Sequence, residues 1–109
     1  IGRDDRTNPR RKSLSQLAAP SDSLYTILLD HQPYHLEEAE AAHIDYQLSG
    51  HTHRGQIWPI SLVVDALYEC SHGCHKRGST SYYVSSGLGI WGGKFRLGTQ
   101  SEYVVMELH

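Results

Sequence analysis

The sequence predicts a single α/β domain with a mixed sheet and one or two short helices, and two patterns indicate this fold class. An apolar run at residues 24–30 is followed by a helix-like segment and by a second run at residues 44–49, in the order strand, helix, strand. Two later segments alternate apolar and polar residues, as half-buried strands do. A chain of 109 residues, 39% hydrophobic and 20% charged, suits one modest core.

The first 23 residues form a polar lead-in, and we expect the folded core over residues 24–109. In the lead-in, "KSLSQLAAP" predicts a short helix that Ser13 begins and Pro20 ends. Five basic residues precede or enter this segment, but Asp4 and Asp5 lie among them, so we interpret it as solvated. With a formal net charge of -2, the composition gives no indication of a nucleic-acid partner.

The core begins with a predicted strand–helix–strand unit. "LYTILLD" (residues 24–30) alternates little, which predicts a strand covered on both faces. "QPYHLEEAEAAH" predicts a helix that starts at Pro33 and has Glu37 and Glu38 in its first turn. "IDYQLS" (residues 44–49) predicts the second strand. Because a right-handed crossover makes the two strands parallel, their carboxyl ends should be neighbours on one edge of the sheet.

The remainder of the chain predicts a helix and two more strands. "IWPISLVVDALYE" reads as a loop and a short helix. "STSYYVSSG" and "SEYVVMELH" predict two strands, joined by the long glycine-rich connection "LGIWGGKFRLGTQ".

Three histidines are candidate metal ligands because they follow the two strand ends. His31 follows the first strand, and His51 and His53 lie in the turn "LSGHTHRGQ" after the second. Neutral imidazole supplies a nitrogen lone pair, and a rigid strand fixes its direction. An H-x-H pair is common in proteins, so the spacing alone leaves metal binding and a solvated turn as even alternatives.

"ILLDHQP", "LSGHTHRGQ" and "YYVSSGLGIWGGKFRLGTQSEYVV" together resemble the C-terminal part of the calcineurin-like metallophosphoesterases, from about Leu24 to Leu108. The resemblance implies a partial αββα sandwich and a site that uses two divalent metal ions, of Mn, Fe or Zn, to hydrolyse phosphomonoesters or phosphodiesters. It implies that His31 and His51 ligate one metal ion and that His53 ligates the other.

The earlier motifs of that family, D-x-H, G-D-x-x-D and G-N-H-[DE], are absent. Asp30 should point away from His31 along the strand, and Asp45 and Asp65 lie far from the ligand turn, so no local carboxylate replaces the bridging aspartate. The sequence also starts without Met. We therefore expect a C-terminal fragment that is inactive alone and belongs to an active phosphoesterase; a non-catalytic metal-binding or assembly module is the alternative.

Arg54 and Gln56 follow the ligand turn and are candidate substrate contacts, although a solvent-facing Arg54 is an equal alternative. A competing signal is "CSHGCHKRG", in which Cys70, Cys74 and two histidines could form a zinc site. The spacing is tight for one loop and no distant pair completes it, so we interpret this segment as a polar turn.

A half-sandwich would expose an apolar face and an open sheet edge, which predicts self-association through the surface left by the missing half. No run of residues is long enough for a membrane span and no signal peptide is evident. The fragment itself should therefore be soluble, and the location of a longer parent protein stays open between cytoplasm and membrane.

Overall fold

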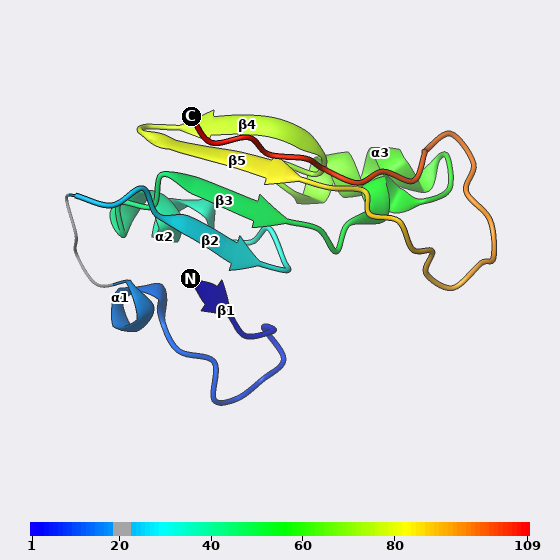
Figure 1. The fold of residues 1–109 in the computed structure, drawn as a ribbon. Helices are drawn as coiled ribbons and strands as arrows, with labels where there is room; N and C mark the ends of the chain where they lie inside the picture. Colours follow the sequence, from blue (N-terminus) through cyan, green and yellow to red (C-terminus); the bar gives the residue numbers. More distant parts are fainter. Residues whose placement is uncertain (19–22) are drawn as a thin grey trace.

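The computed structural model describes residues 1–18 and 23–109 (Figure 1). In it, the two strands predicted on either side of the acidic helix, the helix with Glu37 and Glu38 in its first turn, lie next to each other and run parallel. β2 (Ile27–Asp30) pairs with β3 (Tyr46–Ser49), and α2 (Leu36–Ala41) connects them. The predicted strand–helix–strand unit is confirmed, and it brings the carboxyl ends of both strands to one edge of the sheet.

A mixed sheet of five strands forms the centre of the molecule. In spatial order the strands are β1 (Gly2–Arg3), β2, β3, β5 (Thr80–Val84) and β4 (Gly73–Arg77). The first four are parallel, and β4 runs antiparallel to β5. Among the described residues three short α-helices accompany it, α1 (Leu14–Leu17), α2 and α3 (Ile60–Leu67), together with one 3-10 turn, η1 (His53–Gly55). The predicted α/β class with a mixed sheet is confirmed. The described part of the chain has three α-helices, one more than the one or two that the sequence predicted.

The hydrophobic core lies between the sheet and α2. Leu28 of β2 and Tyr82 and Val84 of β5 are each 1% exposed, and Leu36 of α2 packs with them. The Tyr82 hydroxyl donates a 2.7 Å hydrogen bond to the carbonyl oxygen of Leu36. This bond satisfies the buried phenol and fixes α2 on the sheet.

The opposite face of the sheet, which we call the open face, lacks a covering layer among the described residues. Leu29 of β2 pairs with Leu48 of β3, which pairs with Tyr83 of β5, so the three side chains share this face. Leu29 is 54% exposed. The prediction that residues 24–30 are covered on both faces is therefore wrong, because the described residues supply helices to one face only.

The acidic helix begins three residues later than predicted. Pro33 precedes it, and the N-cap residue His35 has a left-handed backbone with φ 54°. That conformation interrupts the helix, so its first turn begins at Leu36 and contains Glu37 and Glu38 as expected.

The C-terminal segment "SEYVVMELH" does not form the predicted strand. β5 has two neighbours in the sheet, because β3 lies on one side of it and β4 on the other. The prediction missed β4, since residues 73–77 were interpreted as part of a polar turn. β4 thus occupies the position beside β5 that the final segment was predicted to occupy.

The lead-in is attached to the sheet. β1 pairs with β2, and α1 follows directly after Ser13, whose backbone N–H donates to the side chain of Gln16 at 3.1 Å. Leu14 is 3% exposed and belongs to the core. Part of the folded core therefore precedes residue 24; the predicted helix end at Pro20 lies outside the described residues.

Beyond the carboxyl ends of the strands, α3 and the glycine-rich loop project together at one end of the molecule (Figure 1). We call residues 57–67 and 88–97 the apolar lobe. None of the side chains of α3 is buried. Across residues 1–18 and 23–109, no helix has the length and apolar character that crossing a membrane requires.

Candidate metal centre

His31 and His51 meet where β2 and β3 end. Their ring centroids are 5.1 Å apart, and the rings are nearly perpendicular at 79°. The backbone N–H of Gly50 donates to the carbonyl oxygen of His31 at 3.0 Å, which continues the strand pairing up to the two rings. The predicted neighbourhood of the two strand ends is confirmed.

The turn after β3, residues 51–56, has an unusual backbone. His51, His53, Arg54 and Gln56 all have φ between 48° and 68°, a region that costs L-residues energy and clusters at functional sites. Thr52 supports the turn, because its hydroxyl donates to the carbonyl oxygen of Ser71 at 2.7 Å. The surrounding structure thus holds the turn in a conformation that the free chain would avoid.

Gly55 lets this turn approach α3. A Cβ at this position would lie 2.5 Å from the Cα of Ser61, and the φ of Gly55 is 70°. No other residue fits here without moving the helix.

The third histidine, His53, shares a cavity of about 400 Å³ with His31 and His51. Its Nδ1 atom is buried and has no hydrogen-bond partner among the described residues. A buried ring nitrogen without a partner is costly unless a ligand occupies it. The opposite wall of the cavity is apolar and includes Ile60 and Val64 of α3.

The surroundings of His51 favour the neutral form of its ring. Partial burial lowers the pKa of His51, and the nearby His31 lowers it further, while the Asp5 carboxylate opposes both effects. Thr7 holds this carboxylate, donating its backbone N–H and its hydroxyl to Oδ1 at 2.9 and 2.7 Å. Both hydrogen bonds lower the pKa of Asp5, and the bond from the backbone N–H has the larger effect. Sequence reasoning missed Asp5 because only folding brings it near the histidines.

The three histidines carry ring nitrogens of the kind that bind metal ions, and they line one cavity. Imidazole nitrogens suit first-row transition metals, and the His53 Nδ1 atom is available for such a bond. Among residues 1–18 and 23–109, however, no group of three or more His, Cys, Asp or Glu side chains surrounds one point. The described residues alone therefore do not supply a complete coordination shell.

Arg54 and Gln56 have different surroundings from those of the histidines. The Arg54 side chain is exposed and lines a separate polar cavity of about 530 Å³ together with His72 and Glu102. Gln56 is 3% exposed, and its Nε2 atom donates to the carbonyl oxygens of residues 91, 93 and 95 at 2.7, 2.9 and 3.1 Å. Its amide is fully engaged in holding the glycine-rich loop.

A second side chain that organises this loop, Arg96, was not identified from the sequence. Its guanidinium donates to the carbonyl oxygens of Ser86, Gly87 and Gly89 at 2.8, 3.1 and 2.6 Å. A further bond of 3.4 Å reaches the carbonyl oxygen of His53. The loop is therefore tied to the ligand turn through arginine and glutamine side chains, which a pattern of glycines does not predict.

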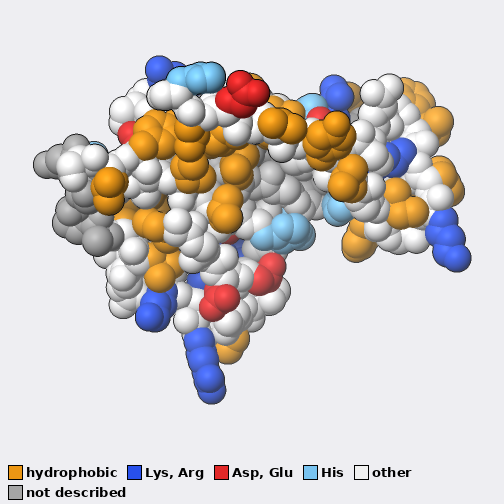
Figure 2. All heavy atoms as spheres, in the orientation of Figure 1, with side chains coloured by type: hydrophobic (Ala, Val, Ile, Leu, Met, Phe, Trp, Pro, Cys, Tyr) orange, Lys and Arg blue, Asp and Glu red, His pale blue; other side chains and the backbone are white. Residues whose placement is uncertain are grey.

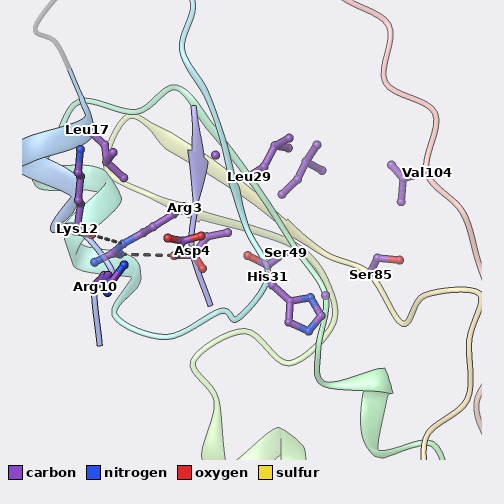
Figure 3. Close-up of a pocket in the computed structure, with 14 residues that line it drawn as sticks. Arg3, Asp4, Arg10, Lys12, Leu17, Leu29, His31, Ser49, Ser85 and Val104 are labelled. Carbon is purple, nitrogen blue, oxygen red and sulfur yellow. Dashed lines mark hydrogen bonds and ion pairs between the residues drawn. The ribbon is translucent and has the colours of Figure 1, made fainter. Parts of the chain in front are cut away.

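A larger groove of about 970 Å³ crosses the open face (Figure 3). In Figure 3, Arg3, Arg10 and Lys12 gather on one side of it, and His31 lies toward the other. Asp30 is 2% exposed and accepts from Arg11 at 2.7 Å, so this carboxylate is already neutralised. That pairing agrees with the expectation that Asp30 is not a bridging metal ligand.

The cysteine-containing segment does not form a turn with four converging ligands. Cys70 is 6% exposed within the core, and its thiol donates to backbone carbonyl groups. Cys74 and His75 are consecutive in β4 and so point to opposite faces of the sheet. The interpretation as a polar turn is wrong for residues 73–77, and the strand geometry does not favour the zinc alternative.

Sequence comparisons give a consistent picture of similar proteins. An uncharacterized metallophosphoesterase of Helicobacter pylori J99 is 47% identical over 85 residues, covering 76% of this chain and 23% of the relative. The uncharacterized metallophosphoesterase YkoQ of Bacillus subtilis is 31% identical over 108 residues, covering 94% of this chain and 40% of the relative. A transmembrane protein with metallophosphoesterase domain from Bos taurus is 40% identical over 80 residues, covering 71% of this chain and 18% of the relative.

The chain thus spans less than half the length of these relatives. No family model matches the sequence. No solved structure matches it either.

Proposed function

This chain belongs to the metallophosphoesterase family, and from that premise we propose that it forms the C-terminal part of a dinuclear-metal phosphoesterase site. The observation that carries the proposal is the shared cavity of His31, His51 and His53, in which His53 Nδ1 has no hydrogen-bond partner among the described residues. In the intact protein the site would hydrolyse phosphomonoesters or phosphodiesters.

The family is one of metal-dependent hydrolases, and two divalent ions of Mn, Fe or Zn are our proposal for this site. His31 and His51 would hold one ion, and His53 would hold the other. Divalent ions in such a pair lower the pKa of a water molecule and neutralise charge on the phosphoryl oxygens. The protein contributes rigid ring positions, which the strand ends and the strained turn fix before any ligand binds.

The chain alone is proposed to be inactive. Its three histidines supply only part of two coordination spheres, and the Asp30 carboxylate that lies next to His31 is paired with Arg11. The relatives extend well beyond the aligned region, and the residues that complete the site would come from such an extension.

Arg54 is proposed as a phosphate contact because its side chain is exposed beside the ligand turn. Gln56 would act on substrate through the loop that its amide holds against the cavity. Reaching the metal centre would require Arg54 to leave the polar cavity that it lines with His72.

The open face is the surface through which we propose self-association of the isolated chain. Leu29 is 54% exposed there and Val104 is 41% exposed, beside the groove that both residues line. Burial of such apolar surface stabilises association by about 25 cal/mol for each Å² removed from water. A monodisperse monomer in light scattering at 100 µM, on the order of the concentrations used for structural work, would contradict this part of the proposal.

The test of the proposed site compares hydrolysis of p-nitrophenyl phosphate with Mn²⁺ by the 109-residue chain and by the full-length gene product. We expect activity in the longer protein only. His51→Gly should reduce that activity by on the order of 10²-fold or more, since loss of a group that merely supports a ligand costs 10- to 100-fold.

His43→Gly is the matched control, because His43 and His51 both have positive φ, at 54° and 68°, which glycine adopts freely. We expect this variant to keep full activity. Bound metal without activity in the longer protein would favour the non-catalytic metal-binding or assembly module, and equal losses in both variants would contradict the assignment of His51.

A further inference from the structure

The apolar lobe exposes an unusual amount of hydrophobic surface beside the candidate metal centre. Ten large apolar side chains in it are between 48% and 77% exposed: Trp58, Ile60, Leu62, Val63, Leu67, Leu88, Ile90, Trp91, Phe95 and Leu97. In Figure 2 the lobe is the projection at the right, where hydrophobic and basic side chains lie together. Soluble proteins rarely leave contiguous apolar surface of this kind without a partner.

α3 has apolar side chains around most of its circumference. Ile60 and Val64 are one turn apart and line the cavity of the histidines. Leu62, two residues from each of them, lies on the opposite side of the helix and is 61% exposed. Val63 and Leu67, beside the cavity-lining pair, are also exposed, at 58% and 71%. A helix that is apolar on opposite sides is normally enclosed by protein or lipid, and this one has solvent on one side.

The residue types in the lobe indicate a lipid surface as the partner. Two tryptophans, Trp58 and Trp91, are 60% and 77% exposed, and indole rings favour the interface between lipid and water. The only acidic residue of the lobe is Asp65, which accepts a hydrogen bond from Ser71. Arg96 is engaged by backbone carbonyl groups, but Lys94 in the lobe and Arg54 beside it have exposed side chains whose positive charges complement anionic headgroups.

Polar contacts to backbone groups also hold the lobe in shape. Gln56 and Arg96 bind the loop through backbone carbonyl groups. The backbone N–H of Trp58 donates to the carbonyl oxygen of Leu97 at 2.7 Å, which joins the two segments of the lobe. The hydrophobic side chains are therefore presented on a fixed framework and stay available to a partner.

We propose that the apolar lobe docks on an anionic lipid surface and that the cavity beside it accepts the apolar part of a lipid phosphate ester. The first statement stands on the lobe alone. The second rests on the proposed function, because it assigns a substrate class to the same histidines. Docking would place the apolar wall formed by Ile60, Val64 and Trp91 next to the membrane from which the substrate comes.

Vesicle sedimentation tests the docking. The protein is mixed in EDTA with vesicles of phosphatidylcholine alone or with phosphatidylglycerol, so metal binding plays no part. We expect sedimentation with the anionic vesicles, at least a tenfold loss in the double variant Val63→Glu, Leu67→Glu, and no loss in Leu24→Glu. Leu24 is a matched control at 70% exposure, and it precedes β2 at the opposite end of the strands.

Three outcomes would overturn docking: no sedimentation of the protein, equal loss in the control, or a lipid-free dimer that the double variant converts to monomer. The last would identify a second copy as the partner.

For the substrate class, the full-length gene product is given phosphatidic acid in these vesicles and soluble p-nitrophenyl phosphate. We expect the double variant to lower the ratio of the two rates about tenfold; an unchanged ratio would overturn the lipid substrate, and inactivity toward both would instead refute the proposed function.

Discussion

On the face of the sheet that α2 covers, apolar side chains are buried and backbone groups pair along the strands. In the apolar lobe, by contrast, the apolar side chains are exposed and polar side chains bind the backbone. Leu28 of β2 is 1% exposed and Leu67 of α3 is 71% exposed. The Gln56 amide binds three carbonyl groups of the lobe. Hydrophobic residues of this chain thus fall into a group that stabilises the core and a group that stays exposed and would contact the proposed partner.

The largest effect expected from this comparison is on the core. Leu28→Ala should lower the free energy of unfolding by about 2–5 kcal/mol, since it removes buried methyl groups and leaves a cavity. Leu67→Ala should change it by no more than about 0.5 kcal/mol. Urea unfolding followed by circular dichroism measures both values, and a similar cost for the two variants would show that α3 is packed against protein.

The next effect is local to the lobe. Gln56→Leu removes the donor for three carbonyl groups of the loop, and a typical hydrogen bond contributes about 0.5–1.5 kcal/mol to stability. We expect amide exchange in residues 88–97 to accelerate by about 10²-fold, with little change in β2 and β3.

Gln100→Leu is the control for this variant, because Gln100 is exposed and its side chain holds no described loop residue. Exchange that accelerates equally in the sheet would mean that the lobe and the sheet open as one unit, and the comparison between them would fail.

A smaller, pH-dependent effect is expected where the loop returns to the sheet. Glu102 accepts from the backbone N–H of Ser86 at 2.8 Å and contacts His72 at 3.2 Å. Partial burial raises the pKa of Glu102, but the contacts with Ser86 and His72 outweigh this effect. The pKa of Glu102 therefore lies below its ordinary value of 4.5. Its stabilising effect is therefore present above pH 4.5 and is lost as the pH falls through the lowered pKa.

Glu102→Gln should accordingly destabilise the protein at neutral pH, and the difference from the wild type should shrink below pH 4.5. Thermal unfolding measured at several values from about pH 3 to about pH 7 shows the trend. A difference that stays constant over this range would contradict the role given to the carboxylate.

The smallest effect concerns the turn that joins the two regions. Arg54 has φ 49°, so Arg54→Gly should raise the free energy of unfolding by about 0.5–1 kcal/mol after the entropy cost of glycine is included. Arg54→Ala keeps the Cβ atom and should give no such gain. Melting temperatures of the two variants distinguish relief of backbone strain from loss of the arginine charge.

The sequence predicted the parts of the fold that depend on local pattern. The apolar runs before His31 and His51 identified two parallel strands, and the intervening acidic segment identified α2. The strand β4 was missed because its residues, Gly-Cys-His-Lys-Arg, carry almost no strand preference and pair only because β5 lies beside them. The final segment was assigned a strand for the opposite reason, since its alternation is strong but β5 is paired on both sides.

For the candidate site, the histidines could be selected from the sequence, and their surroundings could not. Asp5 and Arg96 reach the site through contacts between segments far apart in the chain. The buried state of Gln56 depends on a loop 35 or more residues later. Such contacts are set by tertiary geometry, which single-sequence patterns do not encode.

The position of β4 at the edge of the sheet has a consequence for aggregation. An edge strand offers unpaired backbone groups to other chains, and charged side chains discourage that pairing. β4 carries Lys76 and Arg77 side by side, and Arg77 is bound to Glu40 at 2.7 Å and to Glu69 at 3.0 Å. Arg77 is already paired with two carboxylates, so Lys76 is the charge that a second copy would meet at this edge. Repulsion between the two Lys76 side chains would disfavour joining of the edges, so assembly through the open face would stack sheets without widening them.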